Sequence, residues 1–105
     1  MIRRNTGSLF MAFLICVLNT MDILAADFNK GHEIYTQNCE ICHGVDGRGV
    51  VAGTPNFSFG DNLIKPDIEL FNSISLGKGM SPAYRGVLNE EDIFNVISYL
   101  RTLQR

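Results

Sequence analysis

Apolar side chains recur at helical spacing in three segments of this 105-residue chain. The first segment runs from Phe28 to Asn38, the second from Pro66 to Gly77, and the third follows Asn89. Each segment places apolar residues three or four positions apart, which is the period of one face of an α-helix. We find no convincing strand pattern between them, so the pattern predicts an all-α fold.

The residues at the ends of these segments also favour helices. Pro66 and Asp67 put a proline and an acid into a first helical turn, and Gly77 is typical of a helix end. Asn89 is a suitable N-cap, with Asp92 three residues further on. The last helix is expected to carry an apolar face made of Ile93, Phe94, Val96, Ile97, Leu100 and Leu103.

Cys39, Cys42 and His43, at the end of the first helix, form the pattern C-x-x-C-H, the attachment signal for a c-type haem. Two thiols three positions apart lie on one side of a helical turn, where each can bond to one vinyl group of haem. His43 then directs an imidazole nitrogen at the iron as an axial ligand. A glycine-rich loop from Gly44 to Gly60 is expected to wrap over the cofactor.

Three other uses of the cysteine pair were weighed. A zinc ribbon needs a second cysteine pair, and the only other cysteine is Cys16. A thioredoxin-like redox pair needs a βαβ setting, which the pattern lacks. A structural disulfide between Cys39 and Cys42 remains an alternative.

Residues 1–26 have the pattern of a secretory signal peptide. Arg3 and Arg4 precede a short apolar run from Leu9 to Leu18, and Ala25-Ala26 offers small residues for cleavage. The run is shorter than the roughly 20 residues of a membrane span. The sequence therefore predicts a domain of residues 27–105 exported to the periplasm. An uncleaved N-terminal anchor is the alternative, and only in that case do we expect contact with a membrane.

Removal of 26 residues leaves 79, which is too few for a large hydrophobic core without a staple such as a covalent cofactor. These 79 residues hold seven Lys and Arg against ten Asp and Glu. The negative net charge of these residues argues against nucleic acid as a partner and allows a redox partner with a basic patch.

The chain resembles the class I family of small monohaem c-type cytochromes over nearly all of residues 27–105. Four groups of residues carry the resemblance: Gly31 and Tyr35; Cys39, Cys42 and His43; Gly77-Lys78-Gly79-Met80 with Pro82, Ala83 and Tyr84; and Tyr99 with Leu100. The resemblance implies a cytochrome c fold, with three main helices wrapped around one covalently attached haem c per chain. It also implies that the first and last helices cross near Gly31, where a close approach would explain a glycine inside a helix.

The resemblance further implies that Met80 is the sixth ligand of the iron, opposite His43. Met80 is the only methionine after residue 26, and Ser81 stands between it and Pro82, where the family commonly has proline directly after methionine. By the same resemblance, the Pro55 carbonyl accepts a hydrogen bond from the outer nitrogen of His43.

The remaining site residues are given by position alone. Asn62 and Tyr84 are placed where they would contact haem propionates. His32, the only other histidine, is expected on a solvated surface.

The implied function is one-electron transfer between respiratory redox proteins, without a catalytic residue or an enzyme activity. The expected partners are a reductase or dehydrogenase as donor and an oxidase or terminal reductase as acceptor, and the chain is expected to be a monomer. Two alternatives stay open. If Met80 does not bind, the iron is five-coordinate and the protein is a small-ligand binder or peroxidase-like. The third interpretation is a maturation factor for haem proteins.

Overall fold

A computed structural model of the protein describes residues 26–105, so the predicted signal peptide lies outside the described residues except for Ala26. The elements in chain order are α2 (Phe28–Asn38), α3 (Glu40–His43), the 3₁₀ helix η2 (Phe57–Phe59), α4 (Asp67–Leu76) and α5 (Glu90–Leu100). This part of the chain holds no β-strand, only two isolated bridges, and the all-α prediction is confirmed. None of its helices is long and apolar enough to cross a membrane.

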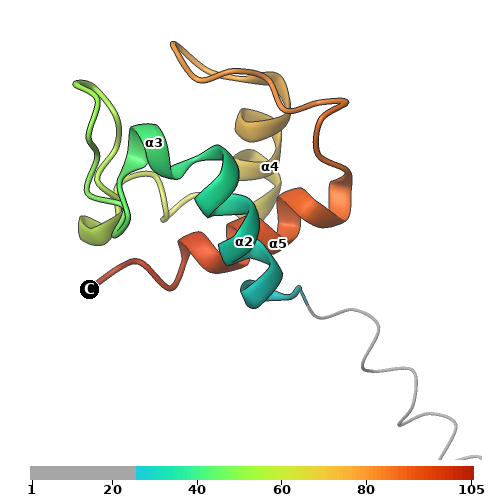
Figure 1. Ribbon diagram of the computed structural model, residues 1–105, viewed down its shortest axis with the longest axis horizontal. Helices are drawn as coiled ribbons and strands as arrows, with labels where there is room; N and C mark the ends of the chain where they lie inside the picture. The colour runs from blue at the N-terminus through green and yellow to red at the C-terminus, as the bar shows by residue number, and fades with distance from the viewer. Residues whose placement is uncertain (1–25) are drawn as a thin grey trace, which may run out of the picture.

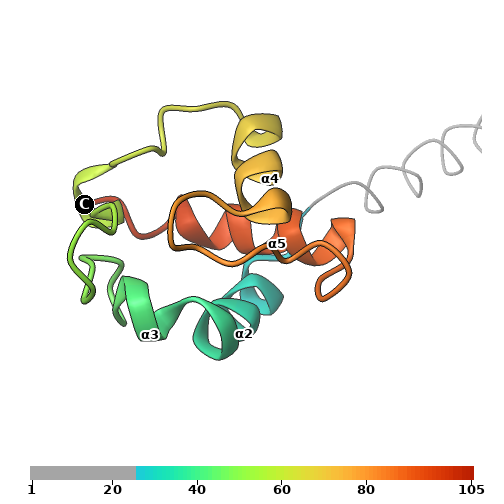
Figure 2. The ribbon, with the colours of Figure 1, turned by 90° about the horizontal axis from the view of Figure 1, so that it is seen from above.

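Helix α5 is the centre of the fold, with α2 packed on one side of it and α4 on the other (Figures 1 and 2). Two long segments, residues 44–66 and 77–89, leave these helices and return to them. The core consists of Ile34, Tyr35, Phe57, Leu63, Leu70, Ile93, Val96, Ile97, Leu100 and Leu103. All the main elements therefore contribute to one core, as expected for a single small domain.

Helices α2 and α5 cross at Gly31, as predicted. A Cβ atom added to Gly31 would lie 2.0 Å from the backbone oxygen of Asn95 and 3.1 Å from Cβ of Tyr99. The rings of Tyr35 and Tyr99 meet at the same crossing, with their centroids 5.2 Å apart. Nearby, the side-chain oxygen of Asn95 accepts a hydrogen bond of 2.8 Å from the Asp27 amide, which ties the start of α2 to α5.

The local signals at the helix ends are confirmed. The Asn89 side chain accepts from the Asp92 amide and the Asp92 side chain accepts from the Asn89 amide, so the two form a capping box at the start of α5. Pro66 is the N-cap of α4, and Gly77 is its C-cap.

The expectation that the last helix continues to Leu103 is wrong, because α5 ends at Leu100. The chain then tightens into a turn in which the Leu103 amide donates to the Leu100 carbonyl over 3.1 Å. This turn brings the Leu103 side chain against Gly47, where it is buried. A helical continuation would not reach that loop.

Arg101 fastens the segment before α4 to the end of α5. Its guanidinium donates to the Leu63 carbonyl over 2.6 Å, to the Lys65 carbonyl over 3.0 Å, and to the Asp67 carboxylate over 3.0 Å. The planar fork of donors on arginine suits several acceptors at once. One side chain thus holds residues 63–67 in place.

Candidate functional site

The C-x-x-C-H residues form a short turn of their own. Helix α2 ends at Asn38, as the apolar spacing predicts, and Cys39 is both the C-cap of α2 and the N-cap of α3. The motif therefore follows the first helix and does not form its last turn. The Cys39 amide still donates to the Tyr35 carbonyl over 2.8 Å, and the Cys39 carbonyl accepts from the His43 amide over 3.0 Å. The change of direction at Cys39 sets the orientation of the three motif side chains.

Both thiols of the motif are free and partly exposed, so the alternative of a disulfide between Cys39 and Cys42 is not realised. Burial, followed by the charge of Cys42, raises the pKa of the Cys39 thiol to about 11. A reactive redox cysteine has the opposite property, a lowered pKa that makes it a thiolate at neutral pH. The Cys39 thiol therefore keeps its proton near neutral pH.

His43 closes the motif and is available as a neutral ligand. Burial lowers the pKa of its imidazole, which keeps the ring uncharged near neutral pH, the form that binds metals. The ring stacks on Phe57 of η2 with centroids 4.9 Å apart. Its Nδ1 atom is buried without a hydrogen-bond partner, so the predicted hydrogen bond to the Pro55 carbonyl is absent here.

The loop after the motif folds back onto it through the backbone. The Gly49 amide donates to the His43 carbonyl over 2.7 Å, and the Val50 amide donates to the Cys42 carbonyl over 2.9 Å. On the other side, the buried Tyr35 hydroxyl donates to the Gly44 carbonyl over 2.6 Å. These bonds hold the peptide that follows His43 against α2.

Met80 lies at the corner of a tight turn between α4 and α5. The Ser81 amide donates to the Lys78 carbonyl over 3.0 Å, and Gly79 has a positive φ of 62°. A positive φ at only the first central position is typical of a type II′ turn. The Met80 side chain, the second central residue, is 94% exposed.

Hydrogen bonds to α4 close the base of this loop. The amides of Tyr84 and Arg85 donate to the carbonyls of Ile74 and Ser75 over 3.1 and 3.0 Å. Figures 1 and 2 both show the loop running from the end of α4 towards the side of the molecule that carries α3, and then turning back to α5. The backbone therefore brings the loop of Met80 towards the side that carries the motif.

Tyr84 ties this loop to the motif. Its hydroxyl donates to the Asn38 carbonyl, directly before Cys39, over 2.8 Å. The propionate contact predicted for Tyr84 from its position stays a prediction. Burial raises the pKa of Tyr84, so the hydroxyl keeps its proton and remains a donor.

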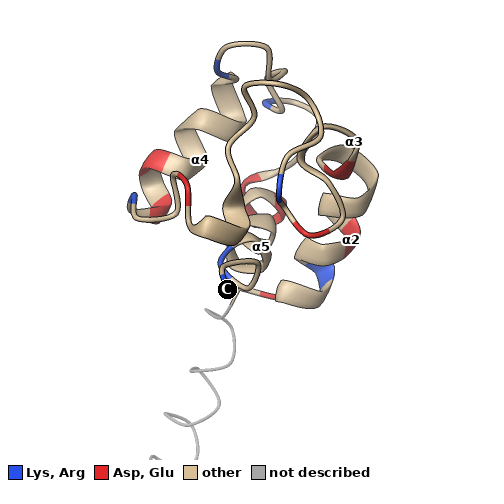
Figure 3. Ribbon diagram, turned by 90° about the vertical axis from the view of Figure 1, so that its left-hand side faces the viewer, with Lys and Arg blue, Asp and Glu red and all other residues tan. Residues whose placement is uncertain are grey.

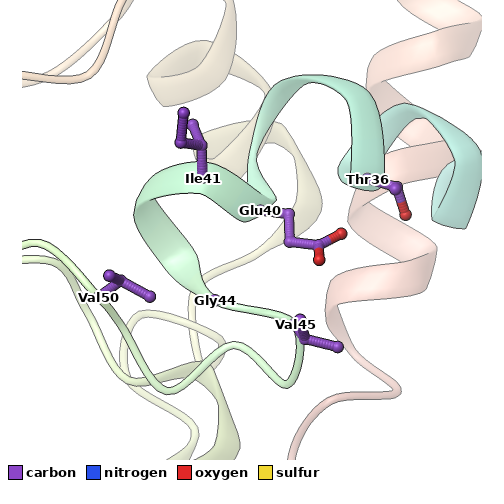
Figure 4. A pocket seen from close by; sticks show the side chains of 6 residues that line it. All are labelled: Thr36, Glu40, Ile41, Gly44, Val45 and Val50. Carbon is purple, nitrogen blue, oxygen red and sulfur yellow. The ribbon is translucent and has the colours of Figure 1, made fainter.

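The outer face of the motif turn borders a shallow pocket. It has a volume of about 380 Å³ and is lined by Thr36, Glu40, Ile41, Gly44, Val45 and Val50 (Figure 4). Of these side chains, Ile41 is 82% exposed. Ile41 thus faces the outside, whereas Glu40 is half-buried.

The residues present fit a covalently attached haem. Two free thiols and a neutral imidazole come from one turn, and a thioether comes from a loop that Tyr84 ties to that turn. Phe59 and Ile64, in the segment before α4, are 81% and 95% exposed. No cluster of three or more His, Cys, Asp or Glu suited to a bare metal ion occurs in residues 26–105.

Charged residues do not form a strong basic field around the site. Figure 3 shows Lys and Arg scattered singly over this face and acidic residues on α3 and α4. The Arg48 side chain is already paired with Asp46 over 2.9 Å.

The sequence does not predict the structural roles of three residues. The buried Asn95, the fork of Arg101 and the hydrogen bond of Tyr84 all act on residues at least 34 positions away. A polar residue on the apolar face of the last helix was the one signal for Asn95. Nothing local indicated the partners of Arg101 and Tyr84.

Comparison with known proteins places these residues in a family. Residues 26–100 match the family model described as cytochrome C oxidase, cbb3-type, subunit III. Cytochrome c6 of Gracilaria tenuistipitata var. liui is 30% identical over 97 residues, which cover 88% of this chain and 90% of that protein.

Solved structures give the same result for the fold. KustC0563 c-type cytochrome superposes with a TM-score of 0.66 at 23% identity, covering 71% of this chain and 98% of that one. Cytochrome c6 from the diatom Phaeodactylum tricornutum gives a TM-score of 0.61 at 25% identity, covering 72% and 92%. The predicted cytochrome c fold is confirmed.

Proposed function

This chain belongs to the class I family of small monohaem c-type cytochromes, and on that basis we propose that it carries single electrons between two redox proteins. Its cofactor is the covalently bound haem c of that family. When bound, haem c supplies an iron centre that alternates between Fe(III) and Fe(II). The protein's task is to hold this centre and to set its potential.

In this proposal, Cys39 and Cys42 form the two thioether bonds, and His43 and Met80 are the axial ligands. The neutral imidazole of His43 and the free thiols next to it support the first three assignments. Met80 supplies a soft sulfur ligand, which favours Fe(II) and raises the potential relative to a second histidine.

The observation that carries the proposal is the hydrogen bond between Tyr84 and Asn38. It joins the methionine loop to the residue before the first motif cysteine, although the two are 46 positions apart in the chain. A ligand binder with an open sixth position would not need the loop of Met80 held there. The arrangement instead supports a closed site with two protein ligands, in which iron changes its charge without exchanging a ligand.

Export and partners complete the proposal. Cleavage after Ala26 would release a periplasmic domain that begins at Asp27, whose side chain caps α2 by accepting from the Asn29 and Lys30 amides. The negative balance of residues 27–105 favours donor and acceptor proteins with a basic docking patch. The protein would transform no substrate and would act as a monomer.

The proposal is tested on the haem-loaded protein, produced with its own leader and a c-type maturation system. Haem should stay with the polypeptide in acid–acetone extraction, and a redox titration should show a single one-electron step. The ferric protein should show the absorption band at the red end of the visible spectrum that reports sulfur bound to iron. Haem that leaves with the organic phase would overturn the covalent attachment.

The same ferric spectrum separates this function from its main alternative. A high-spin spectrum without the sulfur band, together with rapid binding of carbon monoxide after reduction, would mean that the sixth position is open. The protein would then be a small-ligand binder or a peroxidase-like protein.

A further inference from the structure

We propose that Tyr84 is a positioning residue, which holds the Met80 loop against the haem-binding turn through the hydrogen bond from its hydroxyl to the Asn38 carbonyl. The inference rests on the proposed function, in which His43 and Met80 bind iron from opposite sides. It concerns what keeps the second ligand in place.

The Asn38 carbonyl is an acceptor that the end of α2 leaves open. In a continuous helix it would accept from the amide four residues later. That amide belongs to Cys42, and it donates instead to the Cys39 carbonyl over 3.2 Å because the backbone changes direction at Cys39. The Tyr84 hydroxyl takes its place at 2.8 Å.

Tyr84 also joins the loop to α4 through its backbone. Its amide donates to the Ile74 carbonyl in the last turn of α4 over 3.1 Å. One residue is thus bound to α4 by its main chain and to α2 by its side chain. Tyr84 therefore connects α4 to the end of α2.

The turn that carries Met80 has little other support. Its hydrogen bond, from the Ser81 amide to the Lys78 carbonyl, lies within the loop and does not connect it to the rest of the molecule. The Met80 side chain is 94% exposed. The position of the turn relative to the motif therefore depends on the ends of the loop, and Tyr84 fixes one of them.

Two other tyrosines serve as controls. The Tyr35 hydroxyl also donates to a carbonyl beside the motif, but it belongs to α2 and its acceptor is the Gly44 carbonyl. Among the described residues it has no hydrogen bond to the loop that carries Met80. For Tyr99, the described residues give no hydrogen bond from the hydroxyl, and its ring stacks on His32 with centroids 4.7 Å apart. Comparing variants that lack one hydroxyl each distinguishes a hydrogen bond that positions the Met80 loop from one that contributes only to general stability.

The experiment compares Tyr84→Phe, Tyr35→Phe and Tyr99→Phe with wild type, all as haem-loaded ferric proteins. Imidazole can bind the iron only when the thioether has left, so its association rate reports how often the loop moves away. Amide hydrogen exchange at Tyr84 and Arg85 reports the same motion without any ligand. Thermal unfolding measures the general stability of each variant.

We expect Tyr84→Phe to bind imidazole about 2- to 12-fold faster than wild type, the factor that corresponds to one hydrogen bond. Exchange at the amides of residues 84 and 85 should rise by a similar factor. Tyr35→Phe should lose at least as much thermal stability while its imidazole rate stays within about 2-fold of wild type. Tyr99→Phe should change neither quantity.

Two results would overturn the inference alone. One is a Tyr84→Phe variant with the imidazole rate of wild type. The other is a set of variants whose imidazole rates follow thermal stability, with Tyr35→Phe as fast as Tyr84→Phe, because a general loss of stability would then explain the effect. A wild type without the sulfur band in its ferric spectrum would instead overturn the proposed function, and this inference with it.

Discussion

Gly31 on α2 and Asn95 on α5 touch through their backbones, and a Cβ atom on Gly31 would lie 2.0 Å from the Asn95 carbonyl oxygen. At that distance the two helices must separate before any side chain fits. Glycine is a poor helix former, so its presence inside α2 is explained by this contact. The crossing brings Tyr35 against Tyr99 and sets the direction in which α2 leads into the motif.

Gly31→Ala and Gly31→Val should therefore destabilise the protein, although both substitutions favour a helix. Overpacking of this kind typically costs about 1–3 kcal/mol, and valine should cost more than alanine. Chemical denaturation followed by circular dichroism measures the change. Glu33→Val adds a β-branched residue at an exposed position of the same helix and serves as the control. Wild-type stability in Gly31→Val would contradict the crossing.

Tyr35→Phe should lower stability by about 1–3 kcal/mol, because it leaves the Gly44 carbonyl without its donor in a buried place. The loss is measured as a difference in the free energy of unfolding at neutral pH. An unchanged value would show that another donor, such as water, replaces the hydroxyl.

The pH dependence of stability gives a separate test of the hydrogen bond between Tyr35 and Gly44. Burial, the largest cause, raises the pKa of Tyr35 above its usual value of 10.0. In the unfolded chain the phenol loses its proton near that value while the folded protein still keeps it, so wild-type stability should be complete below about pH 10 and fall above it. Tyr35→Phe should show a shallower fall between pH 10 and 12. If the free energy of unfolding of the two proteins falls in parallel above pH 10, Tyr35 is not the cause of the fall.

Arg101→Ala should destabilise the protein by about 1–3 kcal/mol, since hydrogen bonds to a charged donor are worth more than neutral ones. Arg101→Lys should lose nearly as much, because one ammonium group cannot reach acceptors on Leu63, Lys65 and Asp67 together. Asp67→Ala removes the exposed ion pair and an acid in the first turn of α4, each worth less than about 1 kcal/mol, and should cost less than Arg101→Ala. If Arg101→Lys retains wild-type stability, the positive charge is what stabilises the protein, and the several hydrogen bonds of the guanidinium are not needed.

Replacing Met80 tests the proposed sixth ligand. Met80→Ala should become largely high-spin and bind carbon monoxide readily after reduction. Met80→His should stay six-coordinate with a lower reduction potential, because imidazole favours Fe(III) more than thioether does, and axial ligands act within a range of about 0.8 V. The measurements are the ferric spectrum and a redox titration. Unchanged values in Met80→Ala would remove Met80 from the ligand set.

Intact mass should show a purified chain that begins at Asp27 and carries one haem. The Asp27 amide nitrogen donates to the Asn95 side chain. Cleavage of the peptide bond between Ala26 and Asp27 would make that nitrogen the amino terminus, at the start of α2. Ala26→Leu should reduce processing, since cleavage sites require small residues. Recovery of a full-length chain in the membrane fraction alone would favour the uncleaved anchor.

Features that depend on neighbours within a few residues can be predicted from the sequence. The capping box of Asn89 and Asp92 spans four residues, and the C-x-x-C-H motif spans five. Helical period and local capping determine where α2 and α4 lie and where α5 begins. For the same reason, the chemistry of the cofactor could be inferred before any tertiary contact was known.

The way in which these local pieces meet depends on contacts between residues far apart in the sequence. The hydroxyl of Tyr84 reaches a carbonyl 46 positions earlier, and the Asp27 amide reaches a side chain 68 positions later. Helix α5 also stops three residues before its apolar pattern does, and Leu103 packs against Gly47 from the turn that follows. Such contacts depend on the angles at which helices pack, and those angles follow from the fit of many side chains at once, which no short stretch of sequence contains.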